Sequence, residues 1–218
     1  MDTRPVYLKQ LELGPMQNFI YLIGDPSTRE AAVIDPGWEV KKILAAAEQD
    51  GMKLTHVFVT HTHFDHVQGL GELLEAIDLP VYVHEAESAS LDITISNIRP
   101  VEHGDIIHVG ELPITLLHTP GHTPGSQSIL VEGRVLTGDT LFVRAVGRWD
   151  LPGGDPKALH HSLTHTLAKL PDDTIVYPGH NYAEQPTSTI GREKQQNPFM
   201  KLPTVEQFLK AIGSPSGL

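Results

Sequence analysis

An apolar, β-branched run that ends in a cluster of metal-ligand residues constrains this chain more than any other feature. Residues 54–60 read Leu-Thr-His-Val-Phe-Val-Thr, and the hexapeptide His-Thr-His-Phe-Asp-His follows directly at 61–66. The run predicts a buried strand, which makes the hexapeptide the loop at the carboxyl end of that strand. If the extended geometry continues, His61, His63 and Asp65 point one way and the last histidine points another. Such a loop is suited to two neighbouring cations.

The alternative interpretation of the hexapeptide is a polar loop exposed to solvent. Four ligand-type residues in six positions are hard to obtain by chance at a strand end. Charged imidazoles crowded in this way would also repel one another. The hexapeptide therefore predicts a metal site.

The chain length and the absence of long apolar segments bound the domain organisation. The 218 residues suffice for one sizeable core. We expect a single domain over 1–212 and a disordered tail over 213–218, where Gly, Ser and Pro gather. No stretch resembles a membrane span or a secretory signal, so we expect a cytoplasmic protein without a membrane partner.

The composition limits the metal chemistry and the partners. The chain has no cysteine, so a metal site must use histidines and carboxylates, which suit zinc first, with iron and manganese as alternatives. The formal net charge of −11 disfavours a nucleic-acid partner, because phosphate binding needs a basic patch. Two bound divalent cations would return about four positive charges to the site.

The order of predicted elements indicates an α/β fold. Strands are predicted at 18–23, 31–34, 54–60 and 80–84, with helices at 39–49 and 70–77, and this alternation implies a partly parallel sheet. Short strands over 106–136 predict a second, antiparallel sheet. Asp155 and Pro156 predict the start of a helix that runs to about residue 170, followed by a strand at 175–177 and helices at 189–196 and 204–211. Two packed sheets with helices outside form the simplest layered arrangement.

Three more candidate ligands lie just past predicted strand ends. His122 lies in a Thr-Pro-Gly-His-Thr-Pro-Gly loop, Asp139 follows Gly138, and His180 follows Pro178-Gly179. Each alone is also typical of a surface turn. Because open α/β folds place ligands at strand ends, the shared placement indicates a common site. The predicted ligand set comprises five histidines and two aspartates: His61, His63, Asp65, His66, His122, Asp139 and His180.

With these residues in order along the chain, the sequence resembles the metallo-β-lactamase superfamily. That resemblance implies an αβ/βα four-layer sandwich of two mixed β-sheets flanked by helices, with a metal site along one edge. Within the superfamily the chain most resembles the small glyoxalase II-type hydrolases, which are hydroxyacylglutathione hydrolase-like. The supporting stretches are Gly-Arg-Trp-Asp-Leu-Pro-Gly-Gly-Asp at 147–155 and Arg-Glu-Lys-Gln-Gln-Asn-Pro-Phe at 192–199.

The resemblance also implies roles for individual residues. His61, His63 and His122 would hold one metal, whereas Asp65, His66 and His180 would hold the other. Asp139 would bridge the two metals, and Asp65 and Asp139 would act as catalytic residues around a shared hydroxide.

Substrate contacts follow from the same resemblance. Arg148 and Tyr182 occupy positions at which the larger enzymes contact glutathione. Asp150 occupies a position at which those enzymes have a further tyrosine. A salt-bridged loop is the alternative for Arg148 and Asp150. Only about forty residues follow His180, so most of the glutathione-binding helical domain of those enzymes is absent from this sequence.

The implied function is hydrolysis of a small-molecule thioester such as S-lactoylglutathione, by a monomer or homodimer that binds two divalent metal ions. A first rival is a persulfide dioxygenase with a single iron on His61, His122 and Asp139, a two-histidine, one-carboxylate set. A second is a lactonase or another ester hydrolase of the same fold. A non-enzymatic protein with a structural metal is the remaining alternative, although structural zinc sites are usually closed and often use thiolates.

Overall fold

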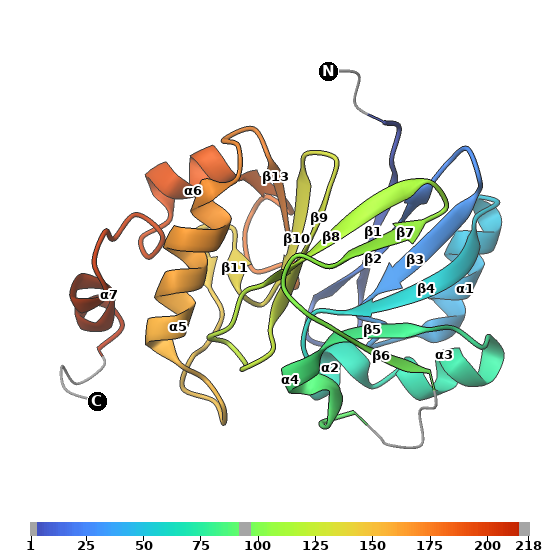
Figure 1. Ribbon diagram of the computed structural model, residues 1–218, viewed down its shortest axis with the longest axis horizontal. Helices are drawn as coiled ribbons and strands as arrows, with labels where there is room; N and C mark the ends of the chain where they lie inside the picture. The colour runs from blue at the N-terminus through green and yellow to red at the C-terminus, as the bar shows by residue number, and fades with distance from the viewer. Residues whose placement is uncertain (1–3, 92–96, 214–218) are drawn as a thin grey trace.

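Two β-sheets packed face to face form the centre of the molecule, and helices cover both outer faces (Figure 1). The computed structural model describes residues 4–91 and 97–213. The αβ/βα sandwich of two mixed sheets predicted from the sequence is confirmed. The expected tail at 213–218 lies outside the described residues apart from Gly213. No helix in the described ranges is both long and apolar enough to cross a membrane.

The first sheet contains the amino-terminal meander and the parallel strands that follow it. Strands β1 to β3 pair antiparallel, whereas β3 to β6 pair parallel. In sheet order the strands are β1 (Tyr7–Leu13), β2 (Asn18–Asp25), β3 (Glu30–Ile34), β4 (Lys53–Val59), β5 (Val81–His84) and β6 (Ile98–Val101). The helices between these strands are α1 (Val40–Gln49), α2 (Phe64–Val67), α3 (Leu70–Ala76) and α4 (Glu85–Ser88).

The second sheet is mixed rather than purely antiparallel, because β13 pairs parallel with β10. In sheet order its strands are β14 (Ser188–Thr189), β13 (Ile175–Pro178), β10 (Arg134–Gly138), β9 (Gln127–Val131), β8 (Leu112–His118) and β7 (Ile106–Val109). A small hairpin of β11 (Leu141–Phe142) and β12 (Ala145–Val146) follows β10. The helices on this side are α5 (Pro156–His161), α6 (Ile190–Gln196) and α7 (Val205–Ala211).

Helix α5 begins where the sequence predicts, and Asp155 caps it by accepting hydrogen bonds from the backbone of Lys157 and Ala158. The helical path then continues through a π-helical turn and a 3₁₀ turn as far as Lys169. Thr189 and Thr204 cap α6 and α7 through their hydroxyls.

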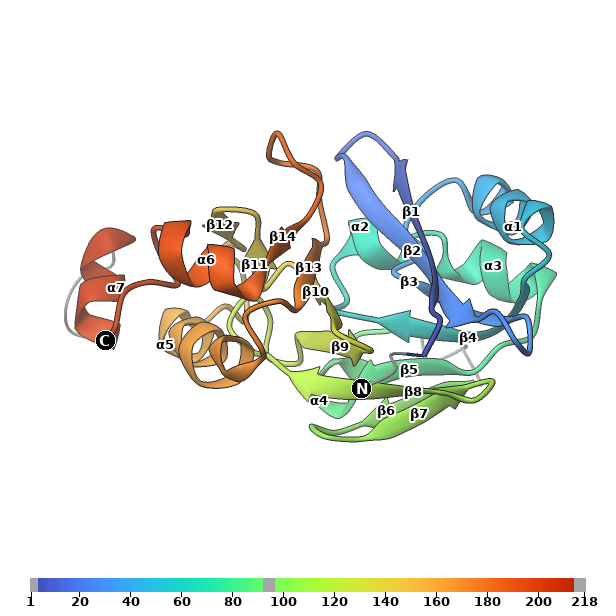
Figure 2. The same cartoon turned by 90° about the horizontal axis from the view of Figure 1, so that it is seen from above.

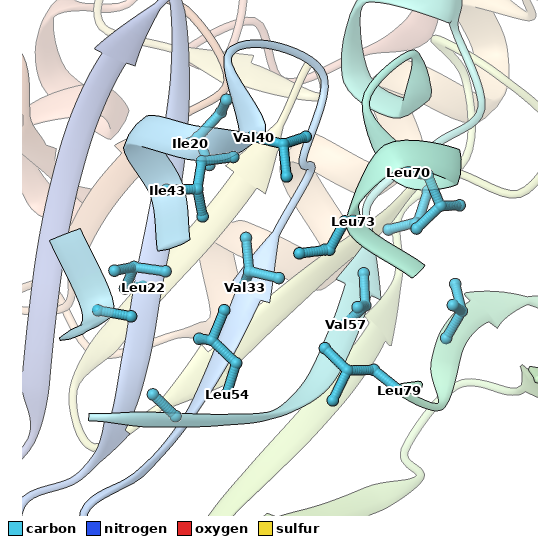
Figure 3. Close-up of a cluster of buried hydrophobic side chains, with 14 of the residues drawn as sticks. Ile20, Leu22, Val33, Val40, Ile43, Leu54, Val57, Leu70, Leu73 and Leu79 are labelled. Carbon is cyan, nitrogen blue, oxygen red and sulfur yellow. The ribbon is translucent and has the colours of Figure 1, made fainter. Parts of the chain in front are cut away.

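Alternation along the buried strand β2 explains how two of the three apolar layers arise. Ile20 and Leu22 face α1 and α3, whereas Phe19, Tyr21 and Ile23 face the second sheet. Figure 3 shows the first of these layers, where side chains of α1 and α3 pack on the first sheet. A third layer lies between the second sheet and α5 to α7, and Figure 2 shows these helices at the opposite end of the molecule from α1 and α3.

Asp25, at the end of β2, links the two sheets. Its carboxylate accepts hydrogen bonds from the hydroxyl of Ser27 at 2.6 Å and from the backbone N–H of Glu111, in the β7–β8 turn, at 2.9 Å. These donors stabilise the ionised form and hold the pKa of Asp25 at about 2. The carboxylate therefore favours the folded state above the pKa of an unfolded aspartate, and this contribution is lost as the pH falls from about 4 towards 2.

We expect Asp25→Ala to lower the free energy of unfolding by about 1–3 kcal/mol at pH 7, because it removes the acceptor of several partly buried hydrogen bonds. Urea unfolding of the wild type and the variant between pH 7 and pH 3 measures this loss. The difference should shrink at the acid end, where the wild-type carboxylate begins to protonate. A difference independent of pH would contradict the assignment to the charged carboxylate.

Candidate metal centre

The predicted ligands lie on loops that leave both sheets at the same edge. The hexapeptide follows β4 of the first sheet, whereas His122, Asp139 and His180 follow β8, β10 and β13 of the second. Each candidate ligand is buried or partly buried. The structure therefore brings all seven predicted residues together, although they span 61–180 of the chain.

The ligand atoms fall into compact groups, and within each group the atoms lie within 4.8 Å of one another. In one group, His63 Nδ1 lies 2.9 Å from His122 Nε2. In another, His66 Nε2 lies 3.3 Å from His180 Nε2. The groups are His61, His63 and His122; Asp65, His66 and His180; and His61, His66 and Asp139.

Asp139 lies between the first two groups. Its Oδ1 is 3.4 Å from His66 Nε2, and its Oδ2 is 3.6 Å from His122 Nε2 and 3.4 Å from His180 Nε2. One carboxylate thus contacts rings of both groups, which is the placement that a bridging ligand requires. Gly138 makes this approach feasible, since its φ is +48° and a Cβ there would lie 2.5 Å from Thr60 Oγ1.

One geometric expectation for the hexapeptide is wrong. The extended backbone does not continue to Asp65, because α2 begins at Phe64. Asp65 therefore does not point with His61 and His63. It joins His66 and His180 instead, with its Oδ2 3.4 Å from His180 Nε2.

The chemistry of these side chains fits divalent metal ions. His61 Nε2 and Asp139 Oδ1 are buried side-chain atoms without a hydrogen-bond partner among the described residues. Such atoms are costly unless something pairs with them, and a cation at the centre would do so. The set of imidazole nitrogens and carboxylate oxygens suits zinc, iron and manganese.

The charges within the centre also favour a cation. Burial and the neighbouring rings of His66 and His122 hold the pKa of His61 well below its ordinary value. Burial opposes ionisation of Asp139, but the rings of His66 and His180 lower its pKa nonetheless. For His180 the carboxylates outweigh burial and raise the pKa to about 10, so a proton there supplies the positive charge that the carboxylates attract.

Backbone and side-chain acceptors orient the histidine rings. His180 Nδ1 lies 2.9 Å from the carbonyl oxygen of Met16, and His122 Nδ1 lies 2.6 Å from that of Arg148. A carbonyl oxygen only accepts, so each Nδ1 carries a proton, and Nε2 is the nitrogen of each ring that faces the centre. Hydrogen bonds of this kind are typical of metal-binding histidines.

Two supporting residues of the centre were not identified from the sequence. Asp35 Oδ2 accepts from Thr60 Oγ1 at 2.6 Å and contacts His66 Nδ1 at 3.0 Å. Asn18 donates to Asp65 Oδ2 at 2.9 Å. Asp35 follows a predicted strand as the ligands do, but Asp-Pro-Gly at 35–37 is also typical of an ordinary turn. Asn18 begins a strand and has no comparable sequence signal.

The residues predicted to bind substrate lie beside the candidate ligands but belong to none of the ligand groups. Arg148 pairs bidentately with Asp150 at 2.9 and 2.8 Å, and both side chains are exposed, which is the geometry of the salt-bridged alternative. Tyr182 stacks on the His180 ring with centroids 4.6 Å apart and remains 55% exposed. Phe64, which is 60% exposed, lies on the hexapeptide itself, so the ligand loops carry exposed aromatic surface.

Comparison with known proteins gives consistent matches along most of the chain. Human persulfide dioxygenase ETHE1 is 33% identical over 96% of this chain and 82% of its own length. The probable metallo-hydrolase YqgX of Bacillus subtilis is 34% identical over 88% of this chain and 96% of its own. The crystal structure of ETHE1 from Myxococcus xanthus superposes with a TM-score of 0.87 at 38% identity, covering 97% of this chain and 92% of that one.

The family model of the metallo-beta-lactamase superfamily matches residues 13–180, which include every candidate ligand. The relatives named above are a persulfide dioxygenase and a probable metallo-hydrolase, and neither is named as a glyoxalase II. The superfamily predicted from the sequence is therefore confirmed, whereas the glyoxalase II type stays a prediction. The match, the two-sheet sandwich and the cluster of histidines and aspartates agree with one another. The chain belongs to the metallo-beta-lactamase superfamily.

Proposed function

We propose that this protein is an iron-dependent enzyme that oxidises a persulfide with dioxygen. The observation that carries the proposal is a pair of buried atoms, His61 Nε2 and Asp139 Oδ1, that have no hydrogen-bond partner within the described part of the chain. His61 shares one compact group with His122 and another with Asp139, and His122 Nε2 lies 3.6 Å from Asp139 Oδ2. These three residues would supply two histidines and one carboxylate to a single iron. This ligand set is typical of non-haem iron oxygenases. Similarity to the persulfide dioxygenase ETHE1 supports the same activity.

The proposed reaction balances as a persulfide, dioxygen and water giving a thiol and sulfurous acid (R–S–SH + O₂ + H₂O → R–SH + H₂SO₃). The sulfur–sulfur bond breaks, the terminal sulfur is oxidised and dioxygen is reduced. Bound iron would supply open coordination positions for both reactants. The chain itself would hold the iron through His61, His122 and Asp139, while Phe64 and Tyr182 offer aromatic surface to the organic part of a small thiol such as glutathione.

Oxygen uptake tests this proposal directly. We expect protein loaded anaerobically with Fe²⁺ to consume dioxygen and form sulfite in equal amounts when glutathione persulfide is added. His122→Ala should abolish both signals, because it removes an iron ligand. A loaded protein with one iron per chain and no sulfite formation above the His122→Ala control would refute the dioxygenase.

Thioester hydrolysis is the second candidate, and a separate observation favours it. Asp65, His66 and His180 form a compact group of their own, and the proposed iron ligands include none of these three residues. Asp139 contacts rings on both sides, as in a two-metal site. Two zinc ions held in this way would activate water for attack on an acyl carbon. A thiolate leaves easily, so little general-acid help is needed, and similarity to the probable metallo-hydrolase YqgX supports this candidate.

Metal content separates the two candidates. Two metal ions per chain, together with thiol release from S-lactoylglutathione that His63→Ala abolishes, would favour the hydrolase. One iron per chain with sulfite formation would favour the dioxygenase. Elemental analysis of the purified protein and the two assays on the same preparation give this distinction.

A further inference from the structure

A repeated contact pattern on the hexapeptide points to a residue that neither candidate reaction uses. Thr60 and Thr62 alternate with His61 and His63, and each threonine gives both its backbone N–H and its hydroxyl to a buried carboxylate. Thr60 donates to Asp35 at 2.7 and 2.6 Å. Thr62 donates to Glu87 Oε2, from its backbone N–H at 3.1 Å and also from its hydroxyl.

The second oxygen of Glu87 reaches the other sheet. Oε1 accepts a hydrogen bond from the backbone N–H of Gly125 at 3.0 Å, three residues beyond His122. The contact is close, since a Cβ at Gly125 would lie 2.4 Å from Glu87 Cγ. One carboxylate therefore joins the loop that carries His61 and His63 to the loop that carries His122.

The burial of Glu87 makes this contact unusual. The residue is only 3% exposed, and no lysine or arginine within the described ranges forms an ion pair with it. A buried carboxylate without a cation is costly, and here three donors compensate. An apolar residue would avoid that cost but could not tie the two loops together.

A second contact fixes the same helix against the His122 loop. His84, at the start of α4, stacks on His118 with ring centroids 3.8 Å apart and an interplanar angle of 14°. His118 Nε2 in turn donates to the carbonyl oxygen of Pro124 at 2.9 Å. Helix α4 therefore contacts Gly125 directly through Glu87, and His84 at its start contacts the end of β8 through His118. These two contacts fix Glu87 against the loop that carries His122.

We propose that Glu87 is a positioning residue that sets the separation of His63 and His122, and with it the affinity of the three-histidine group for a metal ion. Glu87 acts through Thr62 and Gly125 and does not itself belong to a ligand group. The inference rests on the metal centre of the proposed function and is independent of which reaction that centre performs. Outer-shell carboxylates of this kind typically change metal affinity about 10–100-fold.

Cobalt binding to the full-length protein tests the inference, with Glu87→Gln compared with Glu85→Gln. Glu85 is exposed on the same helix and has no hydrogen bond to either loop, so it is a matched control. Titration of metal-free protein with Co²⁺ against a competing chelator gives the affinity, and the visible d–d spectrum reports the ligand geometry. We expect Glu87→Gln to weaken one of the two binding phases about 10–100-fold and to shift its spectrum. Glu85→Gln should match the wild type.

Substitutions at Thr62 provide the second measurement, and they serve if Glu87→Gln fails to fold. Thr62→Val removes the hydroxyl and should reproduce the loss of affinity, whereas Thr62→Ser keeps it and should restore wild-type binding. The midpoint of thermal unfolding of each metal-free variant is measured in parallel. A purely structural role would lower that midpoint and leave the cobalt spectrum unchanged.

The outcomes also separate this inference from the proposed function. The positioning role would be overturned if Glu87→Gln and Thr62→Val bound cobalt with the same affinity and the same spectrum as Glu85→Gln. This outcome does not depend on the activity that the protein shows. A weakened and spectrally altered phase in a protein that has neither dioxygenase nor thioesterase activity would uphold the positioning role and reject the proposed reactions.

Discussion

Asp139→Asn is expected to lower kcat by about 10³-fold or more, a loss of about 4 kcal/mol in transition-state stabilisation. The substitution preserves shape but removes the charge that contacts His66 on one side and His122 on the other. Both candidate reactions need this carboxylate, as an iron ligand in one and as a bridge in the other. The metal content per chain should fall at the same time.

The measurement is steady-state turnover with either substrate, together with elemental analysis after gel filtration. Asp173→Asn, an exposed aspartate in the loop before β13, controls for the loss of one negative charge. Wild-type metal content and more than a tenth of wild-type turnover in Asp139→Asn would remove Asp139 from the centre.

Phe58→Ala is expected to lower the free energy of unfolding by about 3–5 kcal/mol. Phe58 has no exposed surface, and it packs in the layer between the two sheets with its ring centroid 5.3 Å from that of Tyr82. Truncation leaves a cavity that the neighbouring strands cannot close, because both sheets are fixed by their own hydrogen bonds.

Urea unfolding of the metal-free protein measures this loss without a contribution from metal binding. Phe64→Ala is the matched control, since that ring is six residues further along and 60% exposed. Its effect should stay within about 1 kcal/mol. Equal losses in the two variants would show that the sheet interface does not carry the stability assigned to it.

The fold and the ligand set were accessible from the sequence for one physical reason. Ligand residues lie just past apolar, β-branched runs, and carboxyl ends of strands meet at a sheet edge. That argument applies to His122, Asp139 and His180, each of which is ambiguous alone. The structure places all three beside the hexapeptide.

The path of the backbone within the hexapeptide was not accessible in the same way. Helix α2 begins at Phe64 with His63 at its N-cap position, yet His63 makes no side-chain capping bond. No Ser, Thr, Asp or Asn therefore marks the start of this helix at the position where caps usually lie. Tertiary contacts such as Asn18 to Asp65 hold the turn instead, and such contacts leave no local pattern in the sequence.

Edge strands and supporting residues were missed for related reasons. Strand β1 carries Lys9, Gln10 and Glu12, and it is mostly half-buried, so no apolar run marks it. Asp35 has a positive φ of 52° and follows a strand, which resembles an ordinary turn. Only the three-dimensional contact with Thr60 and His66 reveals its role.

Each three-residue ligand group takes two residues from the loop after β4 and one from the second sheet. A nascent chain whose second sheet has not yet docked therefore has no complete coordination sphere to offer. We expect products truncated before residue 122 to bind a divalent metal ion more weakly than the full chain, because they lack the second-sheet member of every group. Tight binding of an ion would therefore depend on docking of the two sheets.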